Sequence, residues 1–319
     1  MLGEKKSENI KGTETMSLTD NNIENENVTQ FDVQEDLNIK SLTSNNDNSD
    51  NNNDQDVSPS LLPLIDGNQL PVTMGLEVIN RCNVSCKMCH GAQIYKTTGA
   101  FPPLKIMKFE EIKHLFKNMK IGGLTLEGYY SEPTMHPEFI EIAKFVKSKG
   151  GIISVITNGM LINKERAKQM VDIGFNNIFL SLHGGSKDVA EDVMEGANFN
   201  RIVENMKHLN RLKQQKGAKC PNVIIMFIAM RRNFQDLPKL IEIGHQIGAS
   251  KVMAKPVKRP GDNSSNVLDL SWWKTENLAD DPKVIAKYYF KAVEEADRLG
   301  VALELGEPYR SIAKSPINV

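Results

Sequence analysis

Short apolar segments alternate with amphipathic segments along the chain from residue 75 onward. The apolar segments are nearly continuous in hydrophobic character, which is typical of strands buried on both faces of a sheet. The amphipathic segments repeat apolar residues three and four positions apart, the spacing of one helix face. The expected strands cover residues 75–79, 123–126, 152–156, 177–182, 222–229 and 251–254, with a final short strand at 301–305.

Capping residues, prolines and glycines mark the ends of the expected helices. Asparagine before an amphipathic segment accepts hydrogen bonds from the first helical N–H groups. Proline favours the first turn and glycine the position after the last. The helices are therefore expected to begin near Pro137, Asn163, Asn198, Asp236 and Pro282 and to end near Gly150, Val171, Gln214, Gly248 and Gly300; an earlier one turns Phe109, Ile112, Leu115, Phe116 and Met119 inward.

This alternation of strand and helix predicts an α/β fold with a parallel sheet. The six units expected here make three-quarters of an eight-unit TIM barrel, so we predict a partial TIM-type (βα)6 barrel over residues 61–305. In such barrels the working residues lie at the C-terminal ends of the strands. Candidate chemistry should therefore be sought where each expected strand ends.

The N-terminal residues differ in composition from the rest. Residues 1–60 hold 4 Lys/Arg against 13 Asp/Glu, a net charge of −9, and residues 41–56 are rich in Asn and Asp. Such a segment buries too little apolar surface to offset the entropy of ordering it. We predict a disordered acidic tail at 1–60 and a short C-terminal tail at 306–319. The whole chain has a net charge of −1, so residues 61–319 carry a net charge of +8. This positive charge indicates either an ordinary protein surface or a basic entrance to a site for an anionic substrate.

Three of the four cysteines lie within eight residues, directly after the first expected strand. Cys82, Cys86 and Cys89 have the spacing C-x3-C-x2-C, and Cys220 stands apart. Three thiolates on one loop can hold three irons of a cubane iron–sulfur cluster and leave the fourth iron open to a small molecule. The alternative is a structural zinc site with His90 as fourth ligand, although Cys89 and His90 are adjacent.

Polar residues follow the next three strands. The segment Gly128-Tyr129-Tyr130-Ser131-Glu132 follows the second, Asn158 the third, and Ser181 with His183 ends the fourth. Because parallel strands share one C-terminal edge, we expect these residues to face the cysteine loop across one mouth. Each also has an ordinary structural explanation, such as a turn residue or a satisfied strand-end side chain.

From about residue 75 to 305 the chain resembles the radical S-adenosylmethionine (SAM) superfamily, and most closely its SPASM/twitch-associated branch. The resemblance rests on Cys82-x3-Cys86-x2-Cys89, on residues 128–133, on Thr157-Asn158-Gly159 and on residues 181–184. It implies one [4Fe–4S] cluster on the three cysteines. It also implies reductive cleavage of SAM to methionine and a 5′-deoxyadenosyl radical, which then removes a hydrogen atom from substrate. Members of that branch often carry a cysteine-rich C-terminal extension, whereas no cysteine follows Cys220 here. Either one cluster is enough for this enzyme or the sequence is an incomplete chain.

The resemblance also implies which residues contact SAM. Glu132 is the candidate acceptor for the SAM ammonium group, Gly128 allows close backbone approach, and Met88 takes the place of an aromatic residue beside the adenine. Polar side chains complete the set. The expected cofactor-binding residues are Met88, Gly128, Ser131, Glu132, Asn158 and Ser181.

Three positions depart from the family pattern. Tyr129-Tyr130-Ser131 replaces a shorter glycine-rich spacer, and His183 stands where relatives often have aspartate. Glu195 falls where relatives often place an arginine that pairs with the SAM carboxylate. The positive charge would then come from Arg231, Arg232 or Lys255, or backbone and hydroxyl groups would make the contact.

We therefore expect a radical SAM enzyme that modifies a peptide or a small molecule and receives electrons from a donor such as flavodoxin or ferredoxin. The alternative is a non-catalytic iron–sulfur or zinc module on a barrel. No apolar stretch approaches the length of a membrane span and no apolar leader follows a basic start, so we expect a cytoplasmic protein with neither membrane nor nucleic acid as partner. Trp272 and Trp273 either pin the long loop 255–281 or form a substrate platform.

Overall fold

The computed structural model describes residues 71–100, 102–258 and 271–315. The predicted tail at 1–60, the first residues of the predicted core and part of the loop 255–281 lie outside the described residues. The strands of the main sheet are β1 (Val72–Leu76), β3 (Ile121–Leu126), β4 (Ile152–Thr157), β5 (Asn177–Ser181), β7 (Asn222–Ala229), β8 (Ala249–Pro256) and β9 (Ala302–Leu305).

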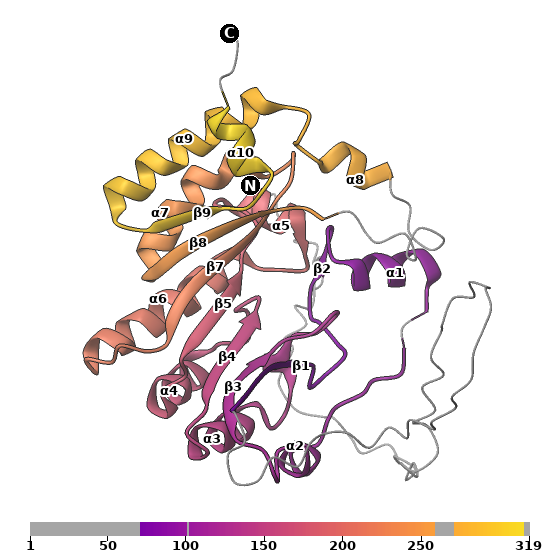
Figure 1. Ribbon diagram of the computed structural model, residues 1–319, viewed down its shortest axis with the longest axis vertical. Coiled ribbons are helices and arrows are strands. Elements are labelled where there is room, and N and C mark those ends of the chain that lie inside the picture. The colour runs from indigo at the N-terminus through magenta and orange to yellow at the C-terminus, as the bar shows by residue number, and fades with distance from the viewer. Residues whose placement is uncertain (1–70, 101, 259–270, 316–319) are drawn as a thin grey trace, which may run out of the picture. The chain divides into compact units, whose positions relative to one another are not determined.

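In the described part of the chain these strands form one seven-stranded parallel sheet in the order β1-β3-β4-β5-β7-β8-β9. Spatial order follows chain order, as it does when each strand is joined to the next by a crossover helix. The fold is the predicted α/β partial barrel, and the short segment at 301–305 joins it as a seventh strand. Figure 1 shows the strands running side by side from β1 to β9.

Amphipathic helices lie against one face of this sheet (Figure 1). Asn163 and Asn198 cap their helices as predicted, each accepting a hydrogen bond from the backbone N–H three residues on. Leu115 is the exception to the predicted inward faces, because its side chain is exposed. The helices are α2 (Phe109–Leu115), α3 (Phe139–Ser148), α4 (Lys164–Ile173), α5 (Lys187–Val193), α6 (Phe199–Gln215), α7 (Leu237–Ile247) and α9 (Pro282–Leu299).

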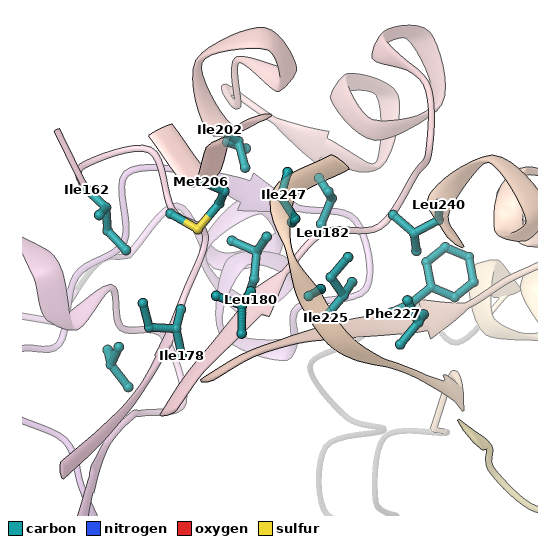
Figure 2. Packing of buried hydrophobic residues seen from close by; sticks show 14 of the residues in the cluster. Ile162, Ile178, Leu180, Leu182, Ile202, Met206, Ile225, Phe227, Leu240 and Ile247 are labelled. Atoms are coloured by element: carbon teal, nitrogen blue, oxygen red, sulfur yellow. The ribbon is translucent and has the colours of Figure 1, made fainter. Parts of the chain in front are cut away.

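The hydrophobic core lies between the sheet and these helices. Figure 2 shows Ile178, Leu180 and Ile225 of the strands packed towards Ile202 and Met206 of α6 and Ile247 of α7. All are buried. Removing such side chains from water stabilises a fold by about 25 cal/mol for each Å² buried. The core fixes the strand ends and thus the residues that follow them.

The first strand differs from its prediction. Residues 75–79 were expected, but β1 is Val72–Leu76 and the chain leaves the sheet after Leu76. Val78 and Ile79 remain buried because the backbone turns to bind the segment before α2, through an isolated bridge between Ile79 and Ile106. An apolar run alone does not distinguish a strand from a buried turn.

Two short elements beside the cysteines were not expected. β2 (Ser85–Cys86) pairs with β6 (Met194–Glu195) in an antiparallel ribbon. The N–H of Lys87 extends this pairing to the carbonyl of Val193 at 2.9 Å. Helix α1 (His90–Thr98) starts directly after Cys89. The cysteine loop is thus held between a ribbon and a helix.

The C-terminal elements follow β8. They are α8 (Ser271–Glu276), α9, β9 and α10 (Tyr309–Lys314). β9 pairs with β8, and α9 packs against α7 and α10. Within the segment expected as a tail, the Tyr309 side chain is fully buried. Its hydroxyl accepts a hydrogen bond from the N–H of Leu278 at 2.9 Å. α10 is thereby tied to the turn between α8 and α9.

Candidate functional site

A cavity of about 380 Å³ opens at the C-terminal ends of the strands. All three cysteines of the C-x3-C-x2-C motif line it, together with every residue predicted to contact SAM. The structure therefore brings the predicted residues together in one place. The lining consists of Cys82, Val84, Cys86, Met88, Cys89, Gly128, Tyr129, Tyr130, Ser131, Glu132, Ile156, Thr157, Asn158, Ser181, His183, Met194 and Ile228.

The three cysteines of the motif are half-buried. Burial raises the pKa of Cys82 to about 12 and raises the pKa values of Cys86 and Cys89 as well. A buried thiol stays protonated unless a cation stabilises its anion. Iron coordination supplies that stabilisation, because a coordinating thiol is deprotonated outright. Three half-buried thiols on one cavity wall fit the cluster that the motif implies.

The zinc alternative requires His90 to lie beside the three cysteines, and it does not. It starts α1 and its ring lies 6.2 Å from that of Tyr129, and it is not among the residues that line the cavity. Across the described residues, no three Cys, His, Asp or Glu side chains surround one point at which a single ion would sit. Ligands of a cubane bind different irons and do not need to converge on one point.

Glu132 is buried and lies at the centre of a hydrogen-bond network. Its Oε1 accepts hydrogen bonds from the N–H and hydroxyl of Thr134, at 3.1 and 2.5 Å, and from the hydroxyl of Thr157, at 2.7 Å. Its Oε2 accepts from the N–H of Asn158 at 2.8 Å. Burial raises the pKa of Glu132, and these hydrogen bonds oppose the rise. A carboxylate has about four acceptor sites, so Oε2 retains one for a ligand.

Sequence reasoning missed the part that Thr157 plays in this network. The residue stands between an apolar strand and Asn158 and is buried. Its hydroxyl donates to Glu132 and accepts from the N–H of Gly159 at 3.0 Å. The one available signal was a hydroxyl at the end of an otherwise apolar strand. Thr157 links the end of β4 to the loop after β3.

The two tyrosines of the spacer that departs from the family pattern lie in different environments. Tyr130 is buried against Tyr95 of α1, with ring centroids 4.8 Å apart, and Tyr129 is 57% exposed at the rim. Gly128 lies close to another part of the protein, since a Cβ there would lie 2.5 Å from the carboxylate of Glu77. Its approach to SAM stays a prediction. That carboxylate accepts a hydrogen bond from the N–H of Tyr129 at 2.7 Å.

Several polar groups face the cavity beside Glu132. The amide nitrogen of Asn158 lies 4.0 Å from the Cys82 sulfur and donates to Asn83 Oδ1 at 2.8 Å. The hydroxyl of Ser131 is buried and has no hydrogen-bond partner within the described chain. A buried hydroxyl without a partner carries a cost of about 1–3 kcal/mol. A ligand in the cavity would remove that cost.

The cationic candidates for the SAM carboxylate lie elsewhere. Arg231 binds Asp280 and Asp281 at the start of α9, and Arg232 binds Glu276 and Asp192. Neither they nor Lys255 line the cavity, and no lysine or arginine is found among the residues that do. Which group contacts the SAM carboxylate stays a prediction. Glu195 is turned away from this cavity and pairs with Lys96 at 2.5 Å.

The loop after β5 is held by hydrogen bonds to the last residues of β7 and to the turn that follows β7. His183 is buried; its Nδ1 accepts a hydrogen bond from the N–H of Ile228 at 3.2 Å, and its carbonyl accepts from Asn233 at 3.0 Å. The ring proton is therefore on Nε2. Asp236 precedes α7 as predicted, and its Oδ2 accepts hydrogen bonds from the N–H groups of Gly185 and Ser186, each at 2.7 Å. No sequence pattern indicated these long-range contacts.

Replacing His183 by glutamine is expected to make folding less sensitive to mild acid. Burial lowers the pKa of His183 to about 3, whereas an unfolded chain has a histidine pKa of about 6.5. Below pH 6.5 the unfolded chain binds a proton that the folded chain does not. The stability of wild type therefore decreases as the pH is lowered, by about 2 kcal/mol between pH 6.5 and pH 5. The measurement is the free energy of urea unfolding at pH 7 and at pH 5. An equal loss of stability from pH 7 to pH 5 in wild type and in His183→Gln would contradict the prediction.

The comparison with protein families agrees with the geometry. Residues 76–243, just over half of the chain, match the family described as the Radical SAM superfamily. The chain belongs to the radical SAM superfamily. The matched segment starts in β1 and ends in α7, so it contains the cysteine loop and the strand ends that surround the cavity.

Curated radical SAM proteins resemble the chain at moderate identity. A tungsten-containing aldehyde ferredoxin oxidoreductase cofactor-modifying protein of Pyrococcus furiosus is 25% identical over 190 residues, 56% of this chain and 49% of that protein. A PqqA peptide cyclase of Bradyrhizobium diazoefficiens is 23% identical over 193 residues, 60% of this chain and 48% of that protein. The chain thus spans about half the length of the curated relatives it matches.

Solved structures share the fold. SuiB of Streptococcus suis bound to S-adenosylmethionine aligns with a TM-score of 0.55 and 13% identity, over 79% of this chain and 54% of SuiB. The crystal structure of SuiB bound to its precursor peptide SuiA also has a TM-score of 0.55 and 13% identity, over 75% of this chain and 49% of SuiB. These values support the partial barrel. In the described part of the chain, no helix combines the length and apolar character needed to cross a membrane.

Proposed function

We propose that the chain is a radical SAM enzyme that binds a [4Fe–4S] cluster through Cys82, Cys86 and Cys89. When bound, such a cluster supplies one electron that cleaves SAM to methionine and a 5′-deoxyadenosyl radical. The observation that carries this proposal is the shared cavity. Three half-buried thiols and a buried carboxylate, from the ends of different strands, line one space of about 380 Å³.

The residues around the cavity would hold SAM in a fixed orientation. Glu132 accepts the ammonium group with the remaining acceptor site of Oε2, a charge-assisted contact. Ser131 and Ser181 offer hydroxyls, and Asn158 lies between Glu132 and Cys82. Met88 and Ile156 supply apolar contacts that exclude water. A dry, preorganised cavity protects a reactive radical from side reactions.

We further propose a peptide as substrate and a flavodoxin or ferredoxin as electron donor, in the cytoplasm. Support for a peptide comes from two similar proteins, because one is a PqqA peptide cyclase and the other, SuiB, binds its precursor peptide SuiA. The seven-stranded sheet has edges at β1 and β9. An incompletely closed barrel gives a chain-like substrate access to the strand ends.

The experiment is anaerobic reconstitution followed by reduction with dithionite in the presence of SAM. We expect about four irons per chain, as one [4Fe–4S] cluster requires, and formation of 5′-deoxyadenosine detected by chromatography. About eight irons would contradict the single cluster. A reconstituted cluster that forms no 5′-deoxyadenosine with either dithionite or reduced flavodoxin would instead favour a non-catalytic binding module.

A further inference from the structure

A second cavity, of about 290 Å³, lies beside the cysteine loop. It is formed by residues of α1, of the β2–β6 ribbon, of the turn after β7 and of α8. Nothing in the proposed chemistry uses these residues. They are Lys87, Gln93, Lys96, Thr97, Glu195, Met230, Arg232, Trp272 and Glu276.

The β2–β6 ribbon separates the two cavities. Cys86 and Met194, which pair in the ribbon, line the first cavity. Their neighbours Lys87 and Glu195 line the second. Successive residues of a strand point to opposite faces, which explains this division. A molecule in the second cavity therefore lies within one ribbon's thickness of the proposed radical source.

The indole of Trp272 has an unsatisfied donor. Its Nε1 is buried and has no hydrogen-bond partner among the described residues. The adjacent tryptophan differs, because Trp273 Nε1 donates to the carbonyl of Val257 at 3.4 Å. Buried indole N–H groups usually have a partner, and Trp272 is one of the residues that line this cavity. Its unsatisfied donor is the reason to look for an acceptor there.

The lysine ammonium groups around the cavity also have hydrogen-bond donors beyond those used in their ion pairs. The ammonium group of Lys87 pairs with the carboxylate of Asp192, and that of Lys96 with the carboxylate of Glu195, each at 2.5 Å. An ammonium has three donors. The Lys96–Glu195 pair is more than 40% exposed on both sides, and exposed pairs contribute little stability. The carboxylate of Glu276 is buried and already bound by Arg232.

We propose that this second cavity binds a carboxylate of the substrate, through the Trp272 indole and the ammonium groups of Lys87 and Lys96. The inference rests on the proposed function, because it takes the substrate to be a peptide. The group bound would be an Asp or Glu side chain of that peptide. Such a contact would place the peptide next to the SAM cavity.

Fluorescence of Trp272 tests the proposal. The chain has two tryptophans, so Trp273→Phe leaves Trp272 as the single indole fluorophore. Reconstituted Trp273→Phe protein is titrated with the blocked peptide acetyl-Gly-Gly-Glu-Gly-Gly-amide and with its Gln counterpart. We expect a saturable change with the Glu peptide and roughly tenfold weaker binding of the Gln peptide, since charge-assisted hydrogen bonds are the stronger ones.

One further variant and a second method make the result specific. Lys96→Gln in the Trp273→Phe background should reduce the preference for the Glu peptide to about threefold or less. Calorimetry with the chain that keeps Trp273 should show the same Glu preference, which excludes an effect of the Phe substitution. Equal binding of both peptides, or no saturable signal in either method, would overturn the proposal. Because the titration does not depend on SAM cleavage, its outcome is separate from that of the 5′-deoxyadenosine assay.

Discussion

Cys86→Ala should lose the cluster and lower 5′-deoxyadenosine formation by at least about 10³-fold, since two thiolates cannot hold a cubane with one open iron. The substitution should leave the fold intact. Cys86 takes part in the β2–β6 ribbon through its backbone, which pairs with Met194, and alanine preserves that pairing. Iron analysis, the visible absorption of the reconstituted protein and the SAM cleavage assay provide the measurements.

The fourth cysteine supplies the matched control. Cys220 precedes β7 and is not among the residues that line the cavity. Cys220→Ala should therefore retain about four irons and wild-type cleavage. If Cys86→Ala kept its cluster while Cys220→Ala lost it, the assignment of the ligands would be wrong.

Glu132→Gln should both destabilise the chain and weaken SAM binding. The amide nitrogen of glutamine would face groups that themselves donate, namely the N–H of Asn158 or the N–H and hydroxyl of Thr134. Unsatisfied buried donors cost about 2–4 kcal/mol in stability. Loss of the charge-assisted contact to the SAM ammonium should raise the Kd for SAM about 10- to 100-fold. Denaturant unfolding and equilibrium dialysis measure the two effects.

Thr157→Val separates the two roles of Glu132. Valine removes one donor to Oε1 but leaves the carboxylate and its charge. We expect a loss of about 1–2 kcal/mol in stability with at most about threefold change in the Kd for SAM. A Kd that rose equally in both variants would show that Glu132 acts on SAM through the network alone, without direct contact.

Most of the strand-and-helix order followed from the sequence because buried parallel strands and amphipathic helices have distinct periodicities. The prediction at 222–229 coincides with β7, and Asn163 and Asn198 cap their helices as expected. The β2–β6 ribbon was not predicted, because two-residue strands are too short to show a period. Its residues Cys86 and Met194 are far apart in the chain and meet through tertiary folding.

The candidate site was predictable where strand ends carry unusual residues, and less so where partners come from distant segments. All predicted SAM contacts line one cavity; their roles remain predictions. Asp236 shows the limit. The predicted helix start is confirmed, because α7 begins directly after Asp236. Its carboxylate also binds the loop at Gly185, where an added Cβ would lie 2.3 Å from the Leu240 nitrogen. Such a contact depends on two segments packing together and leaves no periodic signal in either.

The main-chain pairing of the cysteine loop bears on how the protein tolerates oxygen. The carbonyl of Cys86 accepts from the N–H of Cys89 at 3.0 Å, and Lys87 is bonded to Val193. These hydrogen bonds form between backbone atoms and do not require metal. A chain whose cluster has been destroyed by oxidation should therefore keep its ligand loop in shape. Repair would then require a fresh supply of iron and sulfide and a reductant, with no need for the chain to refold.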